Sequence, residues 1–112
     1  AEDKRLPFAD AEPGMAGAET LLAMLLTLER DGRIDMARVF DLCATAPARL
    51  LGVEAGVLAQ GYEADIALID PEKPWIVDRR KMEASAGNTP FDGQPTQGRV
   101  TALFKGGVAV KL

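Results

Sequence analysis

Residues 17–30 read Gly-Ala-Glu-Thr-Leu-Leu-Ala-Met-Leu-Leu-Thr-Leu-Glu-Arg, and this stretch decides how the rest of the chain is interpreted. It predicts a helix over residues 18–30, with Glu19 in the positive first turn, Arg30 in the last turn and Gly32 as the stop signal. Leucine, methionine and alanine occupy almost every face of that helix, so it needs burial on most sides. A chain of 112 residues offers few other elements to cover it.

A second helical region follows the first. Asp35 is a good N-cap for a helix over residues 35–44. Pro47 has no N–H to donate and predicts a break, after which a short helix capped by Thr45 ends at Gly52.

The sequence changes character on both sides of this helical region. Residues 1–17 are charged and rich in proline and glycine, which predicts irregular structure. After Gly52 the apolar runs become short, which predicts strands. The elements expected there are a strand over residues 64–69, a turn bracketed by Pro71 and Pro74, a strand over residues 75–77, a loop over residues 88–98 and a hairpin over residues 99–112 that turns at Gly106-Gly107. The fold class is therefore α+β.

Composition excludes several classes of function. The formal net charge of −4 provides no basic surface for nucleic acid or an anionic membrane. The apolar run over residues 21–28 is too short to span a bilayer, and no secretory signal precedes it. The single cysteine, Cys43, lies in an apolar stretch and is expected to be a buried packing thiol in a reducing, cytoplasmic compartment.

The absence of histidine is equally informative. The chain has no histidine and one cysteine, whereas zinc hydrolases almost always use imidazole ligands. We therefore expect no metal ligand within this chain: any hydrolytic metal centre takes its ligands from elsewhere, or does not exist. The chain begins with Ala1 rather than Met, which fits an excised or processed fragment.

A set of motifs occurs in a fixed order along the chain. They are Lys4, Pro7, Pro13-Gly14, Gly17-Ala18-Glu19-Thr20, Gly61 with Ala64-Asp65-Ile66 and Asp70, and Asn88-Thr89-Pro90-Phe91-Asp92-Gly93. In this order they resemble the C-terminal part of a dihydroorotase, a member of the amidohydrolase superfamily. The resemblance implies that residues 1–52 are a loop and the last helices of a (β/α)8 barrel, and that residues 53–112 are C-terminal strands of a composite β-sandwich.

The resemblance also implies a chemistry for the parent enzyme. Such an enzyme hydrolyses the cyclic amide of dihydroorotate reversibly to N-carbamoyl-aspartate in pyrimidine synthesis, with zinc held by histidines, an aspartate and often a carbamylated lysine. Those ligands would lie upstream of Ala1, so the resemblance implies no catalytic residue in this chain, and the fragment alone is expected to be inactive. Implied partners are dihydroorotate, the missing N-terminal barrel portion, a second copy in a homodimer, and aspartate transcarbamoylase.

One pair of residues can be carried over as a substrate contact. Family members contact dihydroorotate through backbone groups of a Phe-Gly or Pro-Gly pair, which resembles Pro13-Gly14 here. Glycine lets the backbone approach a small flat ligand closely, and proline stiffens the approach. The alternative is a plain turn. The other polar candidates are expected to be structural: Asp65 and Asp70 beside a strand, Asn88 and Thr89 in a loop, Glu19 in a helix turn, and Arg49 as a pairing residue.

Three other functions remain open at this stage. The parent could be another cyclic amidohydrolase, such as a hydantoinase or an allantoinase. It could be a non-catalytic dihydroorotase-like subunit that supports aspartate transcarbamoylase. It could also be an independent binding module, although the apolar helix would then leave a large exposed patch.

Overall fold

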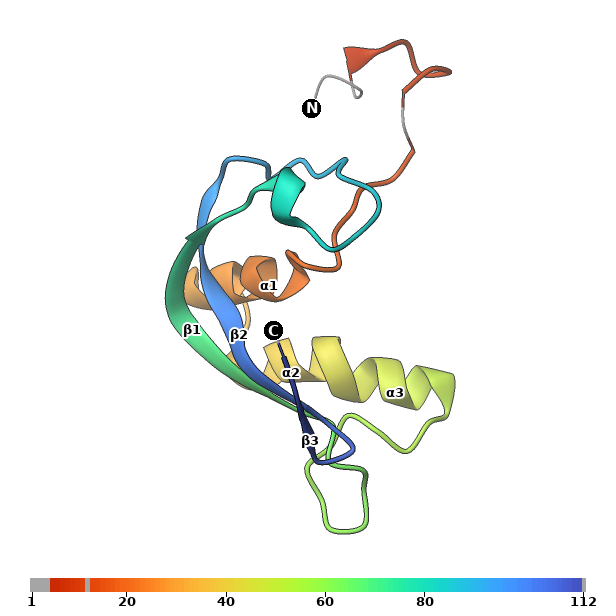
Figure 1. Cartoon of the computed structure of the whole chain (residues 1–112), viewed down its shortest axis with the longest axis vertical. Helices are drawn as coiled ribbons and strands as arrows, with labels where there is room; N and C mark the ends of the chain where they lie inside the picture. The colour runs from red at the N-terminus through yellow and green to blue at the C-terminus, as the bar shows by residue number, and fades with distance from the viewer. Residues whose placement is uncertain (1–4, 12, 112) are drawn as a thin grey trace.

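The computed structural model describes residues 5–11 and 13–111, so Lys4 lies outside the described residues. The elements are α1 (Leu21–Arg30), α2 (Met36–Phe40), α3 (Ala46–Leu51), β1 (Ile66–Ile76), β2 (Pro95–Lys105) and β3 (Val108–Val110). The strands form one antiparallel sheet in the order β1-β2-β3. Figure 1 shows this sheet curving past α1, while the segment before α1 runs away from the body. The predicted α+β class is confirmed.

Helix α1 starts at Leu21, three residues later than predicted. The carbonyl of Gly17 accepts the N–H groups of both Thr20 and Leu21, at 3.1 and 2.9 Å, so residues 18–20 form a turn that leads into the helix. The predicted end is confirmed, because Gly32 has a φ of +69° and Arg30 lies in the last turn. Such a left-handed glycine is a common helix terminator.

The predicted break at Pro47 is wrong, because α2 continues into α3 through a π-helical segment, Asp41–Thr45. In that segment the Ala46 N–H donates to the carbonyl of Asp41. This wider turn directly precedes Pro47, where an α-helix would suffer the missing N–H and the bulk of the ring. Thr45 is helical and caps nothing; its hydroxyl donates to the Gly56 carbonyl at 2.8 Å.

The ends of this helical region are as predicted. The Asp35 carboxylate accepts the Arg38 N–H at 2.7 Å, which is an N-cap. Gly52 ends α3 with a φ of +68°.

Strand β1 passes through both prolines, so the predicted turn between Pro71 and Pro74 is wrong. Asp70 pairs with Arg99 and Pro74 pairs with Gln97, which places three residues of β1 opposite Gly98 alone. The result is a bulge in an edge strand, one of the few places where a sheet tolerates proline. Residues 95–98, predicted as loop, are the start of β2, and residues 95–97 pair with β1.

The C-terminal hairpin is confirmed. Leu103 pairs with Val110 and Lys105 with Val108 across the two-residue turn Gly106-Gly107. Both glycines have positive φ angles, 55° and 79°, as a tight hairpin turn requires.

The apolar core of the described residues is small. It consists of Ala23, Leu26, Val39, Ala48 and Val77. The radius of gyration is 16.1 Å, whereas a compact domain of this length has about 13 Å. The accessible surface is 8469 Å², against about 6,000 Å² for a compact protein of this mass. The chain is therefore more extended than a self-contained domain.

Burial of Cys43 was predicted and is wrong, because this chain leaves the thiol exposed. The segment that carries it, Asp41–Thr45, has no buried side chain. The partial desolvation that remains raises the pKa of the Cys43 thiol, which disfavours the reactive thiolate.

Candidate functional site

Pro13 and Gly14 lie exposed in the segment that leads to α1. Gly14 has a φ of +66°, and a Cβ built there would meet nothing within 4 Å. Glycine is therefore favoured here by the backbone conformation and not by crowding. An exposed backbone with open space beside it is what close approach by a small ligand needs. The substrate contact at this pair stays a prediction.

The segment after this pair is tightly bonded. The Gly17 carbonyl accepts the Thr20 hydroxyl at 3.2 Å in addition to the two backbone N–H groups already described. Thr20 is 1% exposed. The backbone is thus well fixed three residues after Gly14.

Glu19 makes a contact that the sequence did not predict. Its Oε1 atom accepts the backbone N–H of Ala84 at 3.1 Å, across 65 residues of sequence. Glu19 precedes the helix and does not lie in its first turn, which corrects the predicted role. The contact joins the segment before α1 to the loop between β1 and β2.

The remaining acidic candidates have structural roles, as predicted. Asp65 accepts the Gly106 N–H at 2.8 Å and pairs with Lys105. The Lys105 hydrogen bond, followed by that of Gly106, holds the pKa of the Asp65 carboxyl below its usual value. Asp70 accepts the Glu72 N–H at 3.0 Å within the β1 bulge.

The loop and helix candidates are also structural. Thr89 is 2% exposed, and its hydroxyl accepts the Phe91 N–H at 3.3 Å, which orders the loop. Arg49 lies 3.7 Å from Asp41 on the same helical region.

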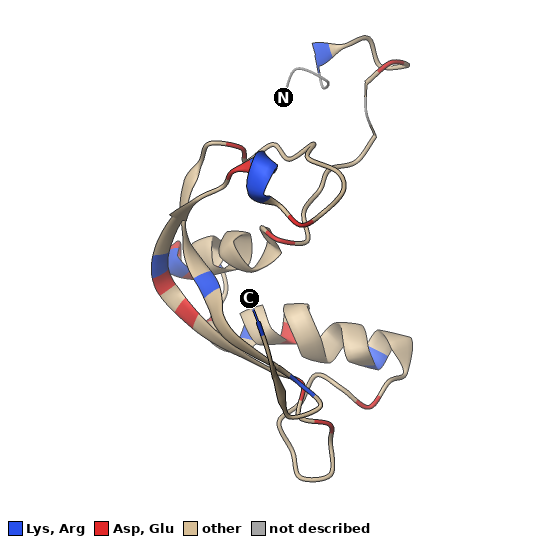
Figure 2. Cartoon of the chain, viewed as in Figure 1, with Lys and Arg blue, Asp and Glu red and all other residues tan. Residues whose placement is uncertain are grey.

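Charged groups are dispersed along the chain. Figure 2 shows basic and acidic residues interspersed, and the basic run Arg79–Lys81 forms a short 3₁₀ helix beside acidic partners. Arg80 bonds to Asp78, and this side-chain hydrogen bond lowers the pKa of the Asp78 carboxyl to about 2. Within residues 5–11 and 13–111, no helix is long and apolar enough to cross a membrane.

A metal centre does not fit the donors that the structure describes. Among the described residues, no three or more His, Cys, Asp or Glu side chains gather where they could hold an ion. The zinc that the dihydroorotase resemblance implies would need ligands beyond these residues.

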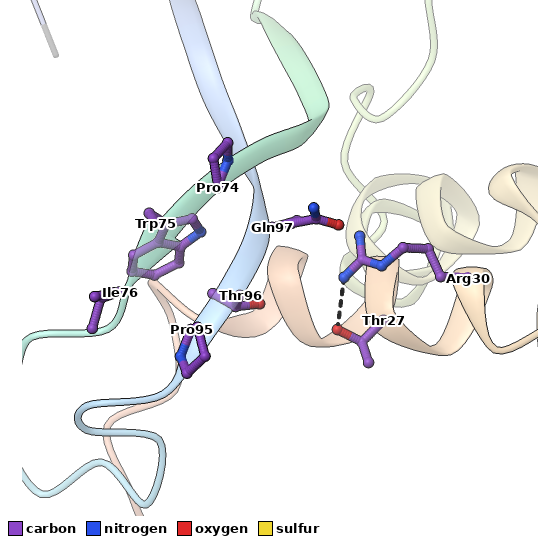
Figure 3. A pocket seen from close by; sticks show the side chains of 8 residues that line it. All are labelled: Thr27, Arg30, Pro74, Trp75, Ile76, Pro95, Thr96 and Gln97. Carbon is purple, nitrogen blue, oxygen red and sulfur yellow. Dashed lines mark hydrogen bonds between the residues drawn. The ribbon is translucent and has the colours of Figure 1, made fainter.

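A shallow groove of about 640 Å³ lies between the end of α1 and the sheet. Figure 3 shows Arg30 and Thr27 on the helix side and Trp75 and Gln97 on the strands. Arg30 donates to Thr27 Oγ1 at 3.0 Å and to the Pro71 carbonyl at 3.4 Å. The bond to Pro71 ties α1 to the bulge, while the bond to Thr27 lies within the helix.

Trp75, on the strand side of this groove, also interacts with residues of this chain. Trp75 Nε1 donates to the Gly98 carbonyl at 3.0 Å. The Arg99 guanidinium lies 4.6 Å from the centroid of the Trp75 ring. Neither contact was predictable from the sequence, because both depend on the register of the bulge.

Comparison with known proteins identifies a family. Residues 10–110 match the model of the amidohydrolase family. A curated dihydroorotase of Pelobacter propionicus is 37% identical over 109 residues, which cover 97% of this chain and 26% of the relative. The chain thus spans about a quarter of the length of the curated relatives it matches.

Solved structures of a hydantoinase and a dihydropyrimidinase are also similar to this chain. An L-hydantoinase (dihydropyrimidinase) from Arthrobacter aurescens is 31% identical, with a TM-score of 0.84, over 97% of this chain and 26% of its own. A dihydropyrimidinase from Brevibacillus agri is 27% identical, with a TM-score of 0.73, over 80% of this chain and 20% of its own.

Proposed function

The chain belongs to the amidohydrolase family, and on that premise we propose that it is part of a cyclic amidohydrolase that hydrolyses the ring amide of dihydroorotate reversibly to N-carbamoyl-aspartate. The observation that carries the proposal is the similarity to a dihydroorotase over 97% of this chain. In this proposal residues 1–52 are a loop and the last helices of the barrel, and residues 53–112 are C-terminal strands of the sandwich. The reaction would belong to cytoplasmic pyrimidine synthesis.

The contribution of this chain to the reaction is to bind and orient the substrate. The Pro13-Gly14 backbone is exposed, and the positive φ of Gly14 sets a direction that other residues adopt only with strain. Backbone N–H and C=O groups presented in this way can hydrogen-bond the amide edge of a cyclic substrate. Zinc would supply Lewis-acid activation of the amide and of water when held by ligands elsewhere.

Further polypeptide is a necessary partner in this proposal. The accessible surface of 8469 Å² exceeds the compact expectation by about 2,500 Å², which is larger than the area one partner buries in a standard interface. Leu50 and Leu58 are 87% and 83% exposed. We propose that the barrel portion of the enzyme covers this surface. A homodimer and aspartate transcarbamoylase are further partners that the dihydroorotase assignment implies.

A second candidate is hydantoin or dihydropyrimidine hydrolysis. The observation that favours it is the TM-score of 0.84 and 31% identity to the Arthrobacter aurescens L-hydantoinase. Both candidates are ring-amide hydrolyses and differ in the substrate that the active site accepts.

Two chimeras test the proposal. In one, residues 1–112 replace the matching segment of the Pelobacter propionicus dihydroorotase; in the other, they replace that of the Arthrobacter aurescens hydantoinase. We expect the chimera with the dihydroorotase to hydrolyse dihydroorotate, and the chimera with the hydantoinase to show no activity. The controls are both enzymes with the segment deleted.

The outcomes separate the two candidates. Activity only in the chimera with the hydantoinase would replace the first candidate with the second. Chimeras that are folded by circular dichroism and gel filtration but inactive on either substrate would contradict both. In an active chimera, Gly14→Ala should raise the KM, because the positive φ costs an L-residue about 1–2 kcal/mol.

A further inference from the structure

The loop between β1 and β2 contacts the segment that carries Pro13-Gly14. Glu19 and the backbone N–H of Ala84 form the joint, with 3.1 Å between Oε1 and N. The adjacent Glu83 is exposed and makes no hydrogen bond or ion pair among the described residues. The joint is therefore a specific contact of one carboxylate with one amide and not a general charge effect of the loop.

The loop over residues 82–93 is held firmly at its base. The Asp92 carboxylate accepts the Arg79 N–H at 2.9 Å, and the Gly93 N–H donates to the Val77 carbonyl at 2.8 Å. Thr89 is buried inside the loop. Because its base is fixed on buried Val77, the loop can present the Ala84 N–H at a defined position.

The other side of the joint is equally fixed. Gly17 accepts three hydrogen bonds from Thr20 and Leu21, and the Thr20 side chain is buried. Glu19 lies between these residues, so its carboxylate projects from a backbone with little freedom. Two ordered segments are thus joined through one charge-assisted hydrogen bond, a type stronger than a neutral one.

We propose that Glu19 is a positioning residue: by accepting the Ala84 N–H, its carboxylate ties the loop over residues 82–93 to the start of α1 and fixes the direction in which the Pro13-Gly14 backbone approaches a ligand. The loop between β1 and β2 thereby influences the orientation of the candidate substrate contact without touching the ligand. This inference rests on the proposed function for the nature of the ligand, a cyclic amide. The joint itself does not depend on that function.

The joint is tested on the 112-residue chain by NMR. Glu19→Ala should speed exchange of the Ala84 amide hydrogen about threefold to tenfold, the range expected for loss of one exposed hydrogen bond. It should also lower the ¹⁵N order parameter of Gly14, which reports fast backbone motion. Glu19→Gln keeps an acceptor oxygen and should restore most of both values. Glu83→Ala is the matched control for loss of charge and should change neither.

The consequence for a ligand is tested in the dihydroorotase chimera. Glu19→Ala should raise the KM for dihydroorotate about threefold to tenfold while kcat changes less than twofold, because ground-state positioning is lost. Glu19→Gln should recover most of the KM, and Glu83→Ala should leave both constants unchanged. A general loss of stability would instead lower the active fraction, and so kcat, without changing KM.

Two results would overturn the inference. One is unchanged Ala84 exchange and Gly14 order in Glu19→Ala. The other is a KM for Glu19→Ala equal to that of the unmodified chimera. If the unmodified chimera is inactive, the proposed function fails, and the NMR measurement still decides whether Glu19 positions Pro13-Gly14.

Discussion

Substitution of Gly98 by alanine should destabilise the contact between α1 and the sheet. Gly98 has a φ of +100°, and a Cβ there would lie 2.3 Å from Leu26 Cδ1. Favourable carbon–carbon contacts lie at about 3.5–4.0 Å, and Leu26 is 1% exposed, so it has little room to retreat. Overpacking of this kind costs about 1–3 kcal/mol, and the positive φ adds about 1–2 kcal/mol. We expect Gly98→Ala to lower the free energy of unfolding by about 2–5 kcal/mol.

A double-mutant cycle separates the two causes. Leu26→Ala alone should cost about 2–5 kcal/mol through loss of a buried side chain. In that background the Cβ of an alanine at position 98 has space, and only the backbone cost of about 1–2 kcal/mol should remain. The coupling energy between Gly98 and Leu26 is therefore expected to be about 1–3 kcal/mol.

Trp75 provides the assay. It is the only tryptophan of the chain, and its Nε1 donates to the Gly98 carbonyl at 3.0 Å. Its emission during urea titration of the 112-residue chain, with sucrose to strengthen effective burial, gives the free energy of unfolding. Leu26→Val is the milder substitute if Leu26→Ala does not fold. A Gly98→Ala cost that is zero, or that is the same in both Leu26 backgrounds, would refute the clash.

Three further outcomes are expected. Hydrogen bonds from Arg80 lower the pKa of the Asp78 carboxyl to about 2. The stability that this pair contributes should therefore be full above the unfolded-state pKa of about 4 and be lost as the pH falls towards 2. Asp78→Asn should flatten that part of the pH dependence of the urea midpoint. Thr45→Val removes the 2.8 Å bond to the Gly56 carbonyl and should cost about 1 kcal/mol in the same titration. Finally, the purified chain, with no histidine and one cysteine, should retain no stoichiometric zinc after dialysis against a weak chelator, as measured by metal analysis.

The predictions that proved correct depended on local signals. The stop at Gly32, the cap at Asp35 and the turn at Gly106-Gly107 each follow from the conformation or hydrogen bonding of one or two residues. The errors at Pro47 and at Pro71 have a common cause. Local rules exclude proline from regular elements, but a π-helical segment and a bulge accommodate it here.

Residues of the candidate site also differ in whether a local sequence signal marks them. Pro13-Gly14 was predicted from a motif to contact substrate, with a plain turn as the alternative; the positive φ of Gly14 fits either role, so the substrate contact stays a prediction. The contact between Glu19 and Ala84 was not identifiable, because its donor is a backbone N–H that carries no side-chain signature. Only the folded positions of α1 and the loop over residues 82–93 bring the two groups together.

The partial burial of α1 agrees with its sequence, because its apolar residues occupy more faces than this chain can cover: only Ala23 and Leu26 are fully buried. The burial predicted for Cys43 is wrong, because the thiol is exposed. Leu50 and Leu51, which are 87% and 74% exposed, flank the end of a helix whose Ala48 is buried. Apolar side chains in such numbers are normally covered in a stable protein. The exposure of these side chains supports our proposal that the barrel portion of an amidohydrolase packs against them.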